Sequence, residues 1–248
     1  MPDLVDLETA RFAALAAPAI DRAFISAIAS PRYRGGRELV QRYGGSDAVG
    51  PMIDLRNVLA AGRSVGREIV HVSPYRYRDP DAIVTSLERT AEAELLEPTA
   101  DGRYVASQKG RSFLGELTSQ HATALGERWA NHSDRVERLT ALIGRVLTAA
   151  DGTGGPGWAT FSPVHEPDGT PAPVVLLNRL QLLRHHRADA HAAGWQAAGL
   201  VAHEIVTLPS GAVRDAIEDD TNVRAAPPYT ALSADERLTL LADLAALP

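Results

Sequence analysis

The sequence predicts a mainly α-helical fold with a winged helix-turn-helix segment, a small β-hairpin and a C-terminal helical domain. Alanine supplies much of the 45% hydrophobic fraction, while aromatic residues make up only 5% of the 248 residues, which favours closely packed helices. Apolar residues recur at helical spacing along most of the chain. One short central stretch has the turn chemistry of a hairpin.

The N-terminal part predicts helices separated by turns. An apolar stripe over residues 7–29 predicts a helix, which Pro18 is expected to kink or divide. Glycines bracket a short helix around residues 38–43. A further helix is expected over residues 51–61, with Pro51 in its first turn.

The central segment, about residues 73–148, carries the most specific pattern. Asp79 is a good N-cap for a helix whose first residue is a proline. Asp101 and Gly102 suit the tight turn of a hairpin. A single long helix is then expected over residues 111–148. The order helix, hairpin, helix is typical of a winged helix.

These central residues resemble regulators of the MarR type. The similar stretches are residues 91–96 (AEAELL), 101–104 (DGRY) and 107–111 (SQKGR), about a quarter of the chain with what lies between and around them. The resemblance implies a winged helix that binds double-stranded DNA. Such proteins bind two-fold sites as homodimers, and the long helix over residues 111–148 is the expected dimer contact.

The C-terminal half is similar to an uncharacterised actinobacterial family of MarR-like winged helix-turn-helix proteins. The similar stretches are residues 186–191 (HRADAH), 197–200 (AAGL) and 226–229 (APPY). The family likeness again implies DNA binding.

A linker is predicted at residues 151–157 (DGTGGPG), because glycine and proline break helices. It divides a helical region over residues 1–150 from a C-terminal helical domain over residues 158–248. Ser233 and Glu236 predict a capping box for the last helix. Further helices are expected over residues 173–194, 200–206 (or a short strand) and 210–219.

Candidate DNA contacts are the polar and basic residues of the central helix, the wing and the helix that follows. Six carboxylates and one arginine lie between residues 79 and 97, which opposes an approach to phosphate. The alternative is therefore that the winged helix only packs or dimerises. The predicted contacts, chosen as donors to phosphates and base edges, are Ser86, Arg89, Thr90, Arg103, Lys109 and Arg111.

A second set of candidates lies on the helix over residues 173–194, where His186 and Asp189 interrupt an apolar stripe. One hypothesis is a pocket for a small aromatic or acidic ligand, lined by His186, Asp189, His191 and Trp195. The alternative is that His186 and Asp189 form a buried hydrogen-bonded pair that fixes helix packing. His186 and His191 are five residues apart and diverge on a helix, so no metal site is expected.

Composition excludes several classes of function. There is no cysteine, which excludes disulfides and thiolate metal sites. No phosphate-binding glycine motif and no nucleophile elbow is present, so we predict no catalytic residue and no cofactor. The N-terminus lacks a secretory signal and charges interrupt the apolar runs, so a cytoplasmic protein without a membrane segment is expected.

The sequence thus predicts a MarR-like, ligand-responsive transcription regulator that binds DNA through its winged helix. The net charge of −6 gives no general attraction for DNA, so binding needs a local basic patch. The alternative is a small-molecule-binding protein or an enzyme that uses the winged helix as a scaffold, with a His/Asp pocket in its C-terminal half.

Overall fold

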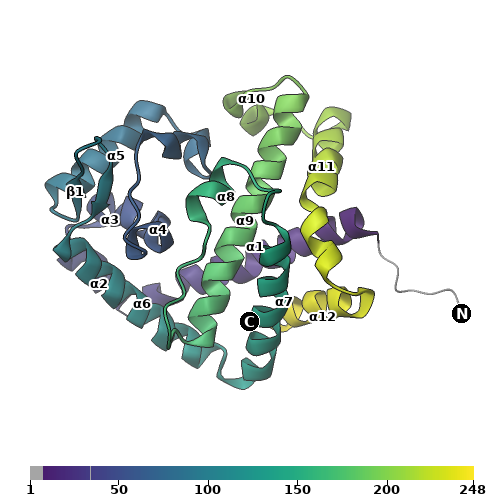
Figure 1. Ribbon diagram of the computed structural model, residues 1–248, viewed down its shortest axis with the longest axis horizontal. Helices are drawn as coiled ribbons and strands as arrows, with labels where there is room; N and C mark the ends of the chain where they lie inside the picture. The colour runs from purple at the N-terminus through teal and green to yellow at the C-terminus, as the bar shows by residue number, and fades with distance from the viewer. Residues whose placement is uncertain (1–7, 34) are drawn as a thin grey trace, which may run out of the picture.

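The computed structural model describes residues 8–33 and 35–248, and this part of the chain is mainly α-helical (Figure 1). The sheet in the described residues has two antiparallel strands, β1 (Leu96–Pro98) and β2 (Tyr104–Ala106). The prediction of a mainly α fold is confirmed.

The central element is α9 (Ala172–Ala197). Of its 26 residues, 15 are buried, and they include polar side chains. Figure 1 shows α9 running through the middle of the molecule. A helix with buried residues around its circumference needs neighbours on several sides. These neighbours are α1 (Thr9–Ala29), α7 (Ser133–Ala149), α8 (Pro156–Phe161) and α11 (Ala212–Ala225).

The first helix, α1, runs through Pro18 as one helix instead of two. By length and composition alone it could cross a membrane, which the sequence analysis did not expect. Its apolar face, which includes Phe12, Ala16 and Ile20, is buried in the protein core. The helix therefore buries one face in the core, and 39% of its apolar window is buried. Residue 7, where the helix was predicted to begin, lies outside the described residues.

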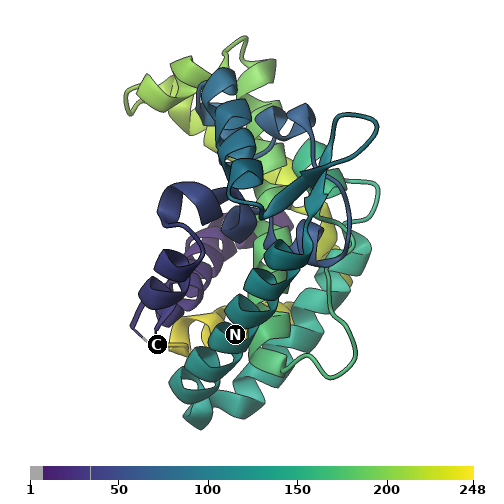
Figure 2. The same cartoon turned by 90° about the vertical axis from the view of Figure 1, so that its left-hand side faces the viewer.

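The central segment has the local features that its sequence predicts. Asp79 caps α5, because its carboxylate accepts a hydrogen bond from the backbone N–H of Asp81 at 3.1 Å. Gly102 has a φ of 74° in the hairpin turn, a conformation that favours glycine. Figure 2, which faces this side, shows the hairpin between α5 and α6. The elements are α2 (Gly36–Arg42), α3 (Ser46–Asp54), α4 (Arg56–Ala60), the 3₁₀ turns η2 (Arg67–His71) and η3 (Tyr75–Tyr77), α5 (Pro80–Glu92) and α6 (Gln108–Arg128).

The prediction of one long helix over residues 111–148 is wrong. Helix α6 ends at Arg128, with Trp129 as its C-cap. A 3₁₀ turn (Ala130–His132) follows, and α7 begins at Ser133. The side chain of Trp129 is buried at the break, with 2% exposure. Apolar residues continue at helical spacing across the break because α6 and α7 each bury a face, so periodicity alone does not reveal it.

The starts of two further helices can be compared with the prediction. Pro51 lies in the second half of α3 and not in a first turn, because α3 begins five residues earlier, directly after Gly45. Ser233 and Glu236 form the predicted capping box of the last helix. The remaining elements are α10 (Ala202–Thr207), the 3₁₀ turn η5 (Pro227–Ala231) and α12 (Ala234–Ala246).

One hydrophobic core spans both sides of the predicted linker. It contains Phe12 and Phe113 from before the linker and Leu177 and Leu244 from after it. A smaller cluster joins the end of α9 to α10 and α11. The two predicted parts, residues 1–150 and 158–248, share this main core. Their division into two domains therefore stays a prediction.

Gly110, in the first turn of α6, tests how closely this helix packs on the hairpin. An added methyl group would lie 2.1 Å from the carbonyl oxygen of Leu95. We expect Gly110→Ala to lower the free energy of unfolding by about 2 to 3 kcal/mol through overpacking. Chemical denaturation measures this change.

Gly115→Ala on the same helix is the matched control, because no atom lies within 4 Å of its added carbon. It should raise stability by up to about 1 kcal/mol, as alanine favours helix over glycine. Equal stabilities of the two variants would contradict the packing of α6 on the hairpin.

Candidate functional site

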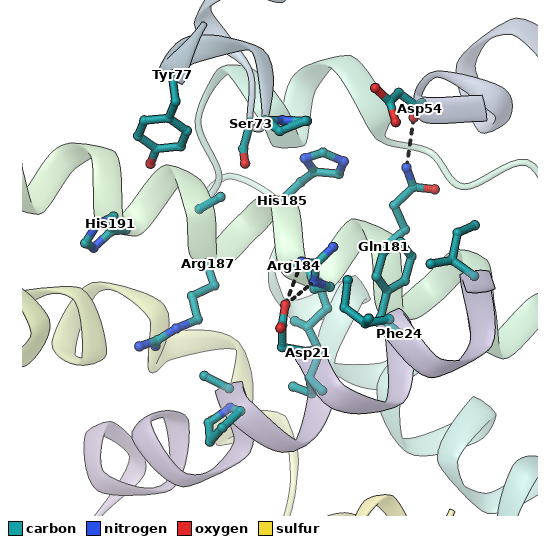
Figure 3. Close-up of a pocket in the computed structure, with 18 of the residues that line it drawn as sticks. Asp21, Phe24, Asp54, Ser73, Tyr77, Gln181, Arg184, His185, Arg187 and His191 are labelled. Atoms are coloured by element: carbon teal, nitrogen blue, oxygen red, sulfur yellow. Dashed lines mark hydrogen bonds and ion pairs between the residues drawn. The ribbon is translucent and has the colours of Figure 1, made fainter. Parts of the chain in front are cut away.

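A cavity of about 740 Å³ lies between α1, α9 and the segment 73–77, and we call it the α1–α9 cavity (Figure 3). Its volume is within the range of small-molecule sites. Apart from Asp21, its wall on the α1 side is apolar and includes Pro18, Phe24 and Ile28. The cavity therefore combines a ligand-sized space with a hydrophobic surface.

One arginine of α9 is already neutralised inside this cavity. Arg184 Nη2 lies 2.6 Å from Asp21 Oδ1 of α1, and the guanidinium stands 4.3 Å from the centre of the Phe24 ring. Figure 3 shows this ion pair joining the two helices, with Ser73 and Tyr77 on the opposite side of the cavity. Arg184 thus holds α1 against α9 and has its charge matched.

Arg187, the next arginine of α9, is matched only in part. Its Nη2 lies 3.3 Å from Glu218 Oε2 of α11. Its Nη1 is buried and has no hydrogen-bond partner among the described residues. Glu218 also lies 3.5 Å from the Nδ1 atom of His191. Burial lowers the pKa of His191 although Glu218 acts to raise it, so the ring is neutral at neutral pH.

Asp189, predicted to line a ligand pocket, instead holds the fold together. Its Oδ1 lies 2.6 Å from Arg76 Nη2, and both side chains are less than 10% exposed. It also accepts backbone hydrogen bonds from Gly155, Gly157 and Trp158 at 3.1, 3.1 and 2.8 Å. Each carboxylate oxygen thus has two donors, which fills its acceptor capacity. The side chain caps α8 and fastens the linker to α9.

The other predicted ligand contacts are divided among three places. His186 is 2% exposed, its Nε2 lies 3.0 Å from Thr153 Oγ1, and burial lowers its pKa. The hydrogen-bond partner of His186 is Thr153 in the linker and not Asp189. The alternative prediction of a hydrogen-bonded His186–Asp189 pair is therefore wrong. Trp195 belongs to the smaller core cluster. His191 lines the α1–α9 cavity, and the other three residues do not.

The predicted DNA contacts on the hairpin and at the start of α6 have partners within the protein. Arg103 binds Ser64 Oγ at 2.7 Å and Glu68 at 2.7 Å. Lys109 donates to the carbonyl of Ala93 at 2.8 Å, and Arg111 donates to the carbonyl of Ala106 at 2.7 Å. These side chains tie the hairpin to the elements beside it.

On α5, Ser86 is partly exposed and Arg89 is exposed, so both are accessible. Thr90 is excluded as a DNA contact, because it is fully buried and its hydroxyl donates to the carbonyl of Ser86. The six carboxylates from Asp79 to Glu97 are all exposed. The accessible charge around α5 is therefore mostly negative.

Sequence reasoning missed two arginines. These are Arg187 of α9 and Arg56 of α4. Arg56 is 7% exposed although it stands between the buried Leu55 and the buried run from Asn57 to Leu59. A charged residue inside a short buried run is the signal that could have found it, since arginine is rarely buried without a partner.

Within the described residues, no group of three or more histidine or carboxylate side chains gathers to hold a metal ion. No protein-family model, curated protein or solved structure matches this chain. The geometry of the cavity therefore carries the functional argument.

Asp189→Asn tests the structural role of this carboxylate. We expect a loss of about 3 to 5 kcal/mol in the free energy of unfolding, because the charge of Arg76 would be left buried and unpaired. Adding Arg76→Met to that variant should recover part of the loss. Thermal and chemical denaturation measure both changes.

Asp220→Asn is the control, since this carboxylate pairs with Arg224 on the exposed side of α11 and should contribute little. If Asp189→Asn were as stable as Asp220→Asn, the anchoring role of Asp189 would be refuted.

Proposed function

We propose that this chain is a small-molecule-binding protein whose α1–α9 cavity takes an organic anion with an apolar part. The observation that carries the proposal is the buried Nη1 atom of Arg187, which lacks an acceptor among the described residues of a ligand-sized cavity. A buried guanidinium nitrogen costs free energy until it is hydrogen-bonded. A carboxylate, sulfonate or phosphate group is the strongest acceptor for it.

The balance of charge in the cavity also favours an anion. Arg56, Arg184 and Arg187 line it, and its carboxylates are Asp21 and Asp54. Asp21 is paired with Arg184. Burial raises the pKa of Asp54, although the nearby Tyr75 hydroxyl acts to lower it. Among the lining residues the arginines outnumber the carboxylates by three to two, while Glu218, which is not in the lining, offsets part of the charge of Arg187.

Binding is better supported than acid–base catalysis. His185 lines the cavity, but its ring stacks on Phe161 with a centroid distance of 3.8 Å. Burial lowers the pKa of His185 to about 3, so it does not exchange a proton near neutral pH. A ligand whose anionic group lies beside Arg187 and whose apolar part lies against α1 would give Arg187 Nη1 an acceptor and cover the apolar wall. No chemical step is needed for this.

Anilinonaphthalene sulfonate, an apolar dye with one negative charge, tests this proposal directly. We expect one dye molecule to bind per chain, with a fluorescence increase. Arg187→Gln should weaken this binding by about tenfold, the loss typical of one hydrogen bond to a charged group. Binding of the uncharged relative N-phenylnaphthylamine should change little.

Arg224→Gln is the matched control, because Arg224 also pairs with a carboxylate of α11 but does not line the cavity. Equal dye affinity for the Arg187→Gln and Arg224→Gln variants would refute the proposed role of Arg187.

DNA binding by a MarR-like winged helix is the second candidate function. The order of α4, Val65, η2, α5 and the hairpin favours it. Val65 forms an antiparallel bridge with Tyr104 of β2 and so adds a third extended segment to the hairpin. α5 would then be the recognition helix. A regulator of this kind acts in the cytoplasm as a homodimer, and both properties stay predictions. The exposed carboxylates around α5 oppose this candidate.

A gel-shift assay with the DNA upstream of the protein's own coding region separates the two candidates. From the charge around α5 we expect no sequence-specific retention at moderate salt. A specific complex that Arg89→Ala abolishes and Arg145→Ala leaves intact would instead assign the chain as a DNA-binding regulator. Arg145 is a suitable control because it lies on α7, paired with Glu236.

A further inference from the structure

A second cavity, of about 330 Å³, lies between α4, α6, α9 and the segment 165–170, and we call it the α4–α6 cavity. It is distinct from the α1–α9 cavity, although Arg56 lines both. Apolar contacts come from Leu114, Val174 and Leu177. The space suits a small group and not a large organic molecule.

The surface of this cavity is largely apolar, and the charged side chains in it are cationic. The described residues that line it include no carboxylate, in contrast to the α1–α9 cavity with its two aspartates. A partly open cleft with arginines and no acid in its lining has a positive potential, which its low-dielectric walls concentrate. Its charged and polar side chains are Arg56, Asn57, Arg111, Thr118, His121, His165, Thr170 and Asn178.

Arg56 is the buried cation of this site. Its Nη1 makes one long contact, 3.5 Å, with the carbonyl of Ile53, and its Nη2 is buried without a hydrogen-bond partner in the described chain. Burial lowers the pKa of Arg56 to about 10, so the side chain still carries its charge at neutral pH. Asp54 favours the charged form but makes no hydrogen bond with it in the described structure. An acceptor for Nη2 is missing.

Hydrogen bonds between helices hold Arg56 at this position. Asn57, the next residue, donates its side-chain N–H to Gln181 Oε1 of α9 at 2.8 Å. Gln181 in turn donates to the backbone carbonyl of Asp54 at 3.1 Å. The backbone before Arg56 and the side chain after it are thus bonded to the central helix.

His121 of α6 also faces this cavity. It is 2% exposed, and its Nδ1 lies 2.9 Å from the carbonyl of Leu117. Burial and the charge of Arg56 lower the pKa of His121 to about 4, although the carbonyls of Leu117 and Ile28 act to raise it. The ring is therefore neutral and feels the positive charge of Arg56, which Asp54 acts on from outside the lining of this cavity.

We propose that the α4–α6 cavity is a second binding site, for a small oxyanion of the phosphate or carboxylate class. An oxygen of the anion accepts a hydrogen bond from Arg56 Nη2, and its charge offsets that of the buried guanidinium. Arg111 at the rim adds a second positive charge. This site is a separate space from the α1–α9 cavity, and the two share only the side chain of Arg56.

Calorimetric titration of the full chain with inorganic phosphate and with succinate tests the proposal. Ionic strength is held constant with sodium chloride, so that general screening does not imitate binding. We expect saturable binding of at least one of the two anions. Tighter phosphate binding would identify a tetrahedral phosphate-like ligand, and tighter succinate binding would identify a carboxylate.

Gly115→Leu should block the site without touching Arg56. Gly115 lines the cavity on α6, and its added side chain meets no atom within 4 Å at the first carbon. Gly126→Leu on the same helix is the matched control, because its position is equally open but lies outside the cavity. We expect anion affinity to fall by about tenfold or more in the Gly115→Leu variant and to stay within about twofold of wild type in the control.

Arg56→Met should abolish anion binding in the α4–α6 cavity. If the Arg56→Met variant does not fold, the Gly115→Leu and Gly126→Leu variants still test the proposal. Absence of saturable binding by both anions, or equal affinity in the Gly115→Leu and Gly126→Leu variants, would overturn the proposal. Dye binding in the α1–α9 cavity should survive Gly115→Leu, so failure of one site is distinguishable from failure of the other.

Discussion

The rest of the structure depends on the buried carboxylate of Asp189. It fastens Arg76 of η3 and the first N–H groups of α8 to one point on the central helix. Arg76 also donates to the carbonyl of Ala188 at 3.3 Å, so η3 lies firmly against α9. Ser73 and Tyr77, which flank this anchor, form a side of the α1–α9 cavity. The residue that the sequence suggested as a ligand contact therefore shapes the cavity from outside.

Features set by neighbouring residues could be predicted from the sequence, and features set by distant ones could not. The cap at Asp79 and the capping box at Ser233 involve partners two or three residues away, and both are present. The break at Trp129 depends on where α7 packs along α9, and local spacing does not encode it. For the same reason, α1 continues through Pro18: its burial in the core supports the helix where the proline removes a hydrogen bond.

The candidate site shows the same limit more sharply. Helical spacing correctly placed His186 and Asp189 on an apolar, buried part of α9. It could not show that Arg76, 113 residues away, takes the carboxylate, or that Thr153 takes the imidazole. Arg56 and Arg187 escaped notice because a single arginine in a helix is usually solvated. Their burial results from contacts with α9 and α11, which only the folded chain brings together.

Buried positive charge and exposed negative charge together distinguish a small anion from DNA as the ligand. Cationic groups with missing acceptors lie inside, at Arg56 and Arg187, while the carboxylates around α5 lie on the surface. A polyanion such as DNA meets the outer, negative charge first and is too large to reach the inner, positive one. A small anion is repelled only weakly by the dispersed surface carboxylates. When it enters a cavity, it gains hydrogen bonds to a buried guanidinium. The same arrangement that opposes nucleic acid therefore favours a small anionic ligand.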